Sequence, residues 1–230
     1  MKERFAFGFR IVGCIVGISG IVLHMLADDI VPAGFMVRHK LAYFTIQTNV
    51  FVVILFGVLI YRTYRAYKKD KQWHIATVNP KFQMAVTLYI TMTMLGFWLL
   101  LAPTTGISRN PFIFMNSLTL HLITPLFAIV DFIWFGMHGQ VSKQDVKYWL
   151  LYPAGYVVFV MLYSKMIQTP YYSFKLQNKQ IDLKYPYPFL DANVIGVWGV
   201  VLAILGLAVI FYLLGRFFVF LDNKKRNSFK

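Results

Sequence analysis

The sequence predicts an all-α, polytopic membrane protein whose six transmembrane helices form a single bundle, with both the N- and C-termini in the cytoplasm. Of its 230 residues, 58% are hydrophobic, 18% are aromatic and only 14% are charged, and the mean hydropathy is +0.59. A chain of this size with so few charges cannot cover a soluble globule with polar surface. We therefore expect most of the chain to lie in a lipid bilayer.

Six stretches are apolar enough for a membrane span, which needs about 20 mostly apolar residues. They cover residues 7–26, 41–62, 82–102, 112–135, 146–167 and 193–218. The connections between them are short, so residues 1–230 are expected to form one domain without a separately folded soluble part. The first stretch follows a basic start, as a signal peptide does, but it ends without a small-x-small cleavage site. It is expected to remain as a span.

The basic residues predict the orientation. With the N-terminus in the cytoplasm, sixteen of the 23 Lys and Arg residues fall on the cytoplasmic side and seven fall outside, which is the positive-inside pattern. This pattern, together with attraction to anionic lipid, explains the net charge of +14 without a nucleic-acid partner. We expect a multi-pass protein of the plasma membrane. The sequence assigns no oligomeric state.

Cysteine usage limits the chemistry. Cys14 is the single cysteine of the chain, which excludes an internal disulfide and a cysteine-based metal cluster. The expected site therefore contains no metal, and no cofactor is expected.

The second span opens with polar side chains inside an apolar run, "YFTIQTNVFV". Thr45, Thr48 and Asn49 are spaced i, i+3 and i+4, so they share one helix face. At about 1.5 Å per residue, Thr45 lies about 6 Å and Asn49 about 12 Å below the outer membrane surface. Each polar group in the bilayer needs a partner. These residues are therefore interhelical hydrogen-bond partners or parts of a site.

The fourth span carries a matching stripe in "NSLTLHLITPLFAIVD". His121 lies about 12 Å deep, and an ionisable residue at such a depth usually marks function. Pro125 has no N–H for the carbonyl of His121, so it frees that carbonyl and is expected to kink the helix beside the cluster. The cost is small if a neighbour's donor takes the carbonyl. Asp131 falls near the cytoplasmic end, where a carboxylate is hydrated or pairs with Lys or Arg.

Together these stripes predict a polar cluster in the outer half of the bundle and an inner half with almost no polar groups. The expected substrate-binding or oxyanion residues are Asn49, Thr48, Asn116, Ser117, His24, Asp191 and Asn193. The outer connection, residues 168–192, is either an interfacial anchor or a lid over the cluster. Within it, "FKLQNKQIDL" predicts a hairpin with a turn at Asn178-Lys179.

Three motifs, "YFTIQTN", "LHLITPLFAIVDFIWF" and "YPYPFLD", resemble bacterial six-helix integral membrane proteins related to the androgen-induced protein and androgen-dependent TFPI-regulating protein family. The animal members are membrane threonine hydrolases that cleave fatty acid esters of hydroxy fatty acids with an essential Thr and His. By motif position, the resemblance implies that Thr45 and His121 are the catalytic pair. The chain departs from the animal pattern at Leu122, where those members have a Thr directly after the His.

This pair can act as nucleophile and general base, because a neutral imidazole can take the proton from a threonine hydroxyl that attacks an ester. The predicted activity is hydrolysis of a lipid ester drawn from the membrane. Two other classes stay open. A non-catalytic lipid-binding or assembly protein needs the polar residues only as hydrogen-bond partners. A small-solute or proton-coupled transporter would use His121 and Asp131 as a relay.

Overall fold

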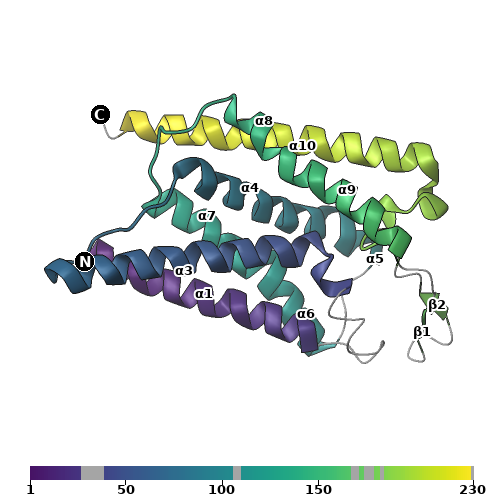
Figure 1. Ribbon diagram of the computed structural model, residues 1–230, viewed down its shortest axis with the longest axis horizontal. Helices are drawn as coiled ribbons and strands as arrows, with labels where there is room; N and C mark the ends of the chain where they lie inside the picture. Colours follow the sequence, from purple (N-terminus) through teal and green to yellow (C-terminus); the bar gives the residue numbers. More distant parts are fainter. Residues whose placement is uncertain (27–38, 106–109, 167–170, 174–178, 182–183, 229–230) are drawn as a thin grey trace. The chain divides into compact units, whose positions relative to one another are not determined.

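The computed structural model describes the whole chain except residues 27–38, 106–109, 167–170, 174–178, 182–183 and 229–230 (Figure 1). Within the described residues, six helices are long and apolar enough to cross a membrane. They are Lys2–Leu26, Phe44–Asp70, Pro80–Leu101, Pro111–Phe135, Asp145–Met166 and Ala192–Lys224. Each overlaps one predicted span, so the prediction of a helical, multi-pass membrane protein is confirmed. The orientation of the termini and the membrane concerned stay predictions.

The chain divides into two compact units. The first comprises Met1–Ala27, Thr45–Ser142 and Phe218–Lys230, and the second comprises Asp28–Phe44 and Lys143–Phe217. They are described separately below. The expectation that the whole chain forms a single bundle stays a prediction.

The first unit contains most of the long helices. Its elements are α1 (Lys2–Leu26), α3 (Phe44–Asp70), α4 (Pro80–Gly96), η1 (Phe97–Leu101), α5 (Ala102–Thr105), α6 (Pro111–Leu118), η2 (Thr119–Ile123), α7 (Thr124–Phe135) and the end of α10 (Ala192–Ser228). Two of these helices start in the same way. Asn79 caps α4 and Asn110 caps α6, each accepting a backbone N–H two residues ahead, and a proline occupies the first turn.

Small residues let α1 approach its neighbours closely. A Cβ at Gly13 would lie 2.6 Å from Phe56 and 2.8 Å from Phe127, and one at Gly20 would lie 2.7 Å from Thr119. Glycine at such contacts allows backbones to pack tightly, which is how helices associate in lipid. As a result, α1 runs beside α3 (Figure 1) and supports η2 from one side.

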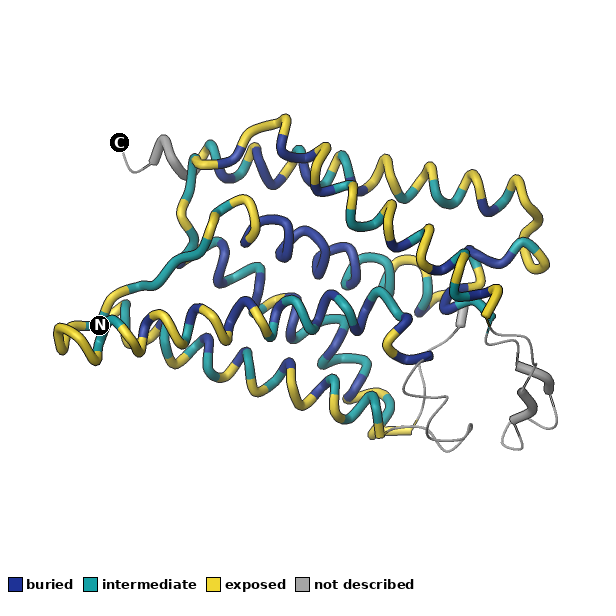
Figure 2. The backbone as a smooth tube through the Cα atoms, in the orientation of Figure 1, coloured by how far each residue is buried: buried dark blue, intermediate teal, exposed yellow. Residues whose placement is uncertain are grey.

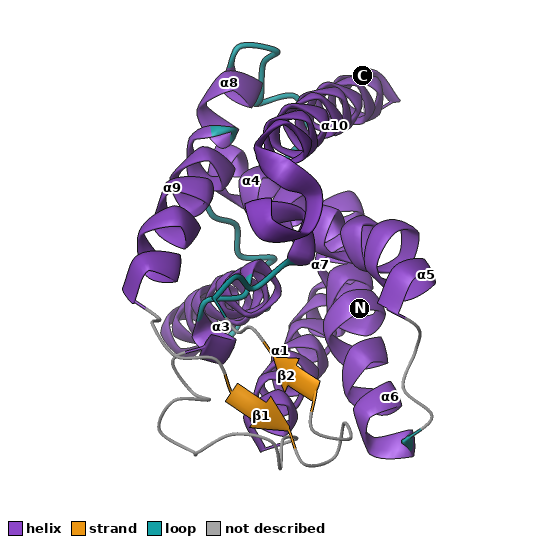
Figure 3. Ribbon diagram, turned by 90° about the vertical axis from the view of Figure 1, so that its right-hand side faces the viewer, coloured by secondary structure: helices purple, strands orange, loops and turns teal. Residues whose placement is uncertain are grey.

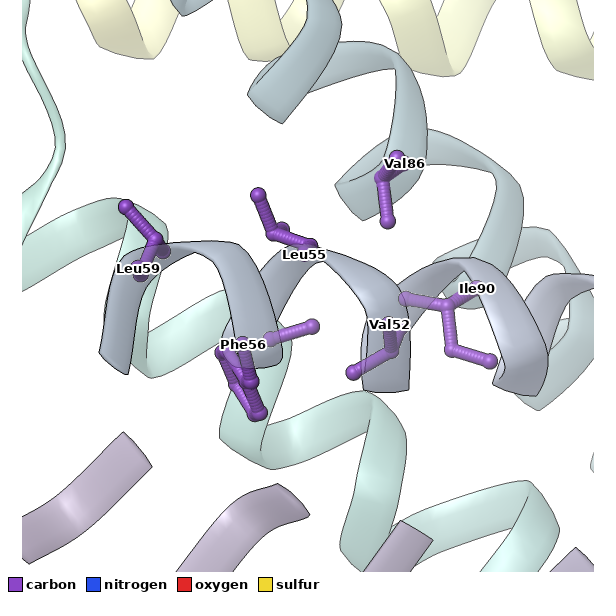
Figure 4. Packing of buried hydrophobic residues seen from close by; sticks show 7 residues of the cluster. Val52, Leu55, Phe56, Leu59, Val86 and Ile90 are labelled. Carbon is purple, nitrogen blue, oxygen red and sulfur yellow. The ribbon is translucent and has the colours of Figure 1, made fainter. Parts of the chain in front are cut away.

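The apolar core of this unit lies between α3, α4 and α7. Its buried members are Val52, Leu55, Phe56, Leu59, Val86, Ile90 and Ala128, most of which are seen in Figure 4. The four from α3 are spaced i, i+3, i+4 and i+7, so they form one face of that helix. Figure 2 shows that α4 is buried along most of its length. Tight packing of these side chains fixes the positions of the helices, since lipid itself provides no hydrophobic drive for helix association.

A buried ion pair crosses the same unit. Arg10 Nε donates to Asp131 Oδ1 at 2.6 Å, Arg10 Nη1 donates to the carbonyl of Ala76 at 2.9 Å, and Gln83 Nε2 donates to Asp131 Oδ2 at 2.9 Å. Arg10 and Asp131 are 1% and 0% exposed. The sequence predicted almost no polar groups in the half of the bundle away from Thr45. These buried side chains show that this expectation is wrong. Arg10 is therefore a buried structural residue of this unit.

The second unit is built around α8 (Asp145–Trp149), α9 (Leu151–Met166) and the first part of α10, with the short η4 (Pro188–Leu190) before α10. The phenol of Tyr156 on α9 donates to the Ala42 carbonyl at 2.8 Å and accepts the backbone N–H of Phe44 at 3.2 Å. These two bonds attach the segment that leads into α3 to α9.

A small hairpin follows α9. Strand β1 (Tyr171–Ser173) pairs antiparallel with β2 (Lys179–Ile181), with Ser173 opposite Lys179 (Figure 3). The predicted hairpin is thus present, but its first strand lies earlier than expected. Lys179 already belongs to β2, so the turn is not at Asn178-Lys179, and Asn178 lies outside the described residues. Whether residues 168–192 act as a lid stays untested.

We predict that Arg10→Met will lower the free energy of unfolding by about 3–5 kcal/mol, because it leaves the carboxylate of Asp131 buried without its cation. The double variant Arg10→Met/Asp131→Leu should recover most of this loss. Thermal unfolding of the purified protein in neutral detergent measures both. Arg65→Met, at an exposed position, serves as the control. Equal effects of Arg10→Met and Arg65→Met would show that the ion pair does not hold the fold.

Candidate functional site

Two residues singled out by the sequence meet in the first unit. Thr45 lies in the first turn of α3, and His121 is the middle residue of η2. Thr45 Oγ1 lies 3.4 Å from His121 Nε2. This is long for a hydrogen bond, although such bonds in empty catalytic sites are often long and shorten with substrate. The structure thus brings together a hydroxyl and an imidazole that are far apart in the chain.

The other nitrogen of His121 determines the tautomer. His121 Nδ1 lies 2.9 Å from the carbonyl oxygen of Ser117. A carbonyl can only accept, so Nδ1 carries the proton, and in the neutral ring Nε2 then presents a lone pair. The lone pair is on the side of Thr45, which is the form that a general base requires. Ser117, expected to contact substrate, contributes here through its backbone.

Two consecutive residues of η1 hold His121 in place. The ring of Phe97 stacks on the imidazole with 3.8 Å between ring centroids and 14° between planes. Trp98 Nε1 donates to the carbonyl of His121 at 3.0 Å. The carbonyl that Pro125 leaves without its usual donor is therefore paired.

A π-helical turn frees two carbonyls at this point. The N–H of Thr124 bonds to Thr119 and not to Leu120, and Pro125 has no N–H to give to His121. The carbonyls of Leu120 and His121 therefore lose their α-helical donors. Both take side-chain donors from other helices, Asn49 Nδ2 at 3.1 Å and Trp98 Nε1 at 3.0 Å.

Phe97, Trp98 and both π-turns were not predicted from the sequence, although one signal for the π-turns is present in it. Each π-turn directly precedes a short helix whose second residue is proline, Pro103 in α5 and Pro125 in α7. A proline deep in an apolar helix leaves a carbonyl without its usual donor. Single π-turns of this kind occur frequently at functional sites.

Asn49 uses both of its amide hydrogens within the protein. Its Nδ2 donates to the carbonyls of Thr45, at 2.8 Å, and Leu120, at 3.1 Å, which uses both amide hydrogens. Its Oδ1 is buried and accepts no hydrogen bond within the described part of the chain. The role of oxyanion donor expected for Asn49 therefore does not fit this geometry, while a role in substrate binding stays a prediction.

Thr48 joins helices in the same region. Its Oγ1 lies 2.8 Å from Oγ1 of Thr93 on α4 and donates to the carbonyl of Thr45 at 3.1 Å. Thr48 is fully buried. Its side chain is thus engaged in packing α3 against α4, although the sequence analysis placed it among the substrate-binding candidates.

His24 and Asn116 form a second pair. Asn116 Nδ2 lies 3.2 Å from His24 Nδ1, and since the amide nitrogen can only donate, this histidine nitrogen accepts. The second hydrogen of Asn116 Nδ2 has no acceptor among the described residues, and its Oδ1 is buried without a partner there. Asn116 thus keeps one donor for a ligand.

Asp191 and Asn193 belong to the second unit. Asp191 Oδ1 accepts the backbone N–H of Asn193 at 2.8 Å at the start of α10, which is the geometry of a helix N-cap. Their participation in the Thr45 site stays a prediction. Among the residues that the structure describes, no three His, Cys, Asp or Glu side chains gather as metal ligands would.

Comparisons with known proteins leave the site to be interpreted from its own geometry: no family model, curated protein or solved structure matches the chain.

We predict that Trp98→Phe will lower the free energy of unfolding by about 1–3 kcal/mol, because it leaves the carbonyl of His121 without a donor. Trp134→Phe, which alters a side chain that is 55% exposed, is the matched control and should cost less. Thermal unfolding in detergent compares the two. If both substitutions cost the same, the Trp98 hydrogen bond does not hold η2.

Proposed function

We propose that the protein is an intramembrane hydrolase of lipid esters, with Thr45 as nucleophile and His121 as general base. The observation that carries this proposal is the Thr45–His121 contact, in which Nδ1 is committed to the Ser117 carbonyl and Nε2 faces the hydroxyl. The sequence motifs support it independently, since their resemblance to membrane threonine hydrolases points to the same two residues. Fatty acid esters of hydroxy fatty acids are the substrate class that this resemblance suggests.

The first half of the reaction forms an acyl-enzyme. His121 Nε2 takes the hydroxyl proton while Thr45 Oγ1 attacks the ester carbonyl carbon, giving a tetrahedral oxyanion. Collapse of this intermediate breaks the bond to the alcohol oxygen, and the imidazolium returns its proton to that leaving group. A hydroxy fatty acid leaves and the acyl chain stays on Thr45.

The second half of the reaction uses water. Nε2 takes a proton from water as the water oxygen attacks the acyl carbon, and collapse returns the proton to Thr45 Oγ1 and releases the fatty acid. Asn116, one turn before His121 in the same span and expected from the sequence as an oxyanion residue, is the donor we assign to the oxyanion, whose stabilisation is usually a large part of catalysis.

The backbone carbonyl of Ser117 takes the orienting position that a carboxylate has in a Ser-His-Asp triad. A neutral carbonyl fixes the tautomer but stabilises the imidazolium less than a carboxylate does. In the bilayer, a carbonyl in place of a carboxylate avoids the cost of burying a negative charge beside His121. Asp131 does not serve instead, since it is engaged by Arg10 and Gln83. The same engagement argues against an Asp131 proton relay in a transporter.

The non-catalytic alternative also has support. Thr48 and Asn49 make the interhelical hydrogen bonds that an assembly role requires. In that case Thr45 would be one more hydroxyl whose loss affects only stability. A measurement of activity separates the two functions.

We predict that Thr45→Ala, His121→Ala and their double variant will each lower the rate of lipid-ester hydrolysis by at least about 100-fold, and to a similar level, because the pair acts as a unit. Thr45→Ser should keep part of the rate, since it keeps the hydroxyl. The assay is fatty acid release from an ester of a hydroxy fatty acid by protein in lipid nanodiscs.

Thr48→Val is the matched control, because it removes a neighbouring hydroxyl from the same helix face. It should lower stability and leave most of the rate. If Thr45→Ala stays folded and hydrolyses the ester at the parent rate, the hydrolase assignment to this pair is refuted.

A further inference from the structure

The end of α3 carries a basic surface that the proposed reaction does not use. The helix continues past residue 62, where the predicted span ended, to Asp70. This extension exposes Arg62, Arg65, Lys68 and Lys69, and Lys71 follows it. Arg65, Lys68 and Lys69 make no ion pair within the described part of the chain. Their charges are therefore available to a ligand.

Aromatic residues fold the next segment back onto this surface. The ring of Trp73 stacks on Tyr67 at 4.5 Å between centroids and lies 5.1 Å from the ring of Phe7 on α1. The guanidinium of Arg4 is 6.0 Å from the Trp73 ring, which is within the range of a cation–π contact. The start of α1 and the end of α3 thus lie at the same side of the membrane and bring cations from both helices together.

Two carboxylates lie near these cations. Glu3 pairs with the N-terminal amine at 3.1 Å, and Asp70 pairs with His74 at 2.9 Å. Glu3 thus has a cationic partner, whereas the charge of Asp70 is balanced only when His74 is protonated. The six cations outnumber this one carboxylate, and we call them the basic patch: Arg4, Arg62, Arg65, Lys68, Lys69 and Lys71.

The position of the patch identifies its partner. Tyr61 and Tyr64, which flank Arg62 where the patch begins on α3, are 61% and 53% exposed. Tyr and Trp at the end of an apolar helix typically mark the interface between hydrocarbon and water. The cations that follow are then at the level of lipid phosphates. We infer that the basic patch is a binding site for an anionic phospholipid of the adjacent leaflet, held through its phosphate groups.

The test compares lipid retention in native mass spectrometry after purification from mixed micelles of phosphatidylglycerol and phosphatidylcholine. The parent protein should retain phosphatidylglycerol in preference. Arg65→Gln/Lys69→Gln, which removes two exposed cations from the patch, should weaken that preference by about tenfold or more. Lys143→Gln/Lys147→Gln removes the same charge from exposed positions elsewhere and should retain the parent preference.

Three results would overturn the inference. Equal loss in both double variants would show a diffuse charge effect without a site. Thermal stabilisation by inorganic phosphate equal to that by phosphatidylglycerol would indicate a soluble anion. Displacement of the lipid by a DNA oligonucleotide through the same residues would indicate a nucleic-acid surface. Since the readout is lipid retention, the outcome does not depend on whether the protein hydrolyses esters.

Discussion

The hydrocarbon of a bilayer supplies no hydrogen bonds, so backbone polar groups at depth must find their partners within the protein, and an ionisable side chain there is costly unless it is engaged. His121 shows what this constraint produces. Its Nδ1 donates to the Ser117 carbonyl, its own carbonyl accepts from Trp98, and one ring face is covered by Phe97. Only Nε2 is left to face a reactive group, and that group is the hydroxyl of Thr45. The partners that stabilise the histidine thereby also define its tautomer and orientation.

The same constraint explains why a proline belongs in this span. Pro125 and the π-turn before it remove the α-helical donors of two carbonyls, which in lipid would be costly if they stayed unpaired. Asn49 from α3 and Trp98 from η1 replace those donors. Hydrogen bonds thus join α3 and η1 to η2 at the candidate site. Elsewhere in the first unit, Arg10 and Asp131 follow the same rule with charges, because each is buried and each is the partner of the other.

Hydropathy was sufficient to predict six apolar helices, because a span is specified by length and composition alone. Helical spacing placed Thr45 and His121 on inward faces at similar depth, and the structure brings their side chains together. Spacing could not identify Phe97, since nothing in an apolar run marks which aromatic ring stacks on a distant histidine. It also could not identify Arg10 as the cation that pairs with Asp131, since the two residues are 121 positions apart in the chain.

The central claim is that Thr45 is a nucleophile activated by His121, and covalent labelling tests it most directly. The protein in nanodiscs is treated with a fluorophosphonate, which transfers its phosphonyl group to an activated hydroxyl and releases fluoride, and the adduct is located by peptide mass spectrometry. The account predicts one adduct, on Thr45, that is lost in His121→Ala while Thr48→Val keeps it. An adduct on another residue, or labelling of Thr45 that is unchanged in folded His121→Ala, would contradict the account.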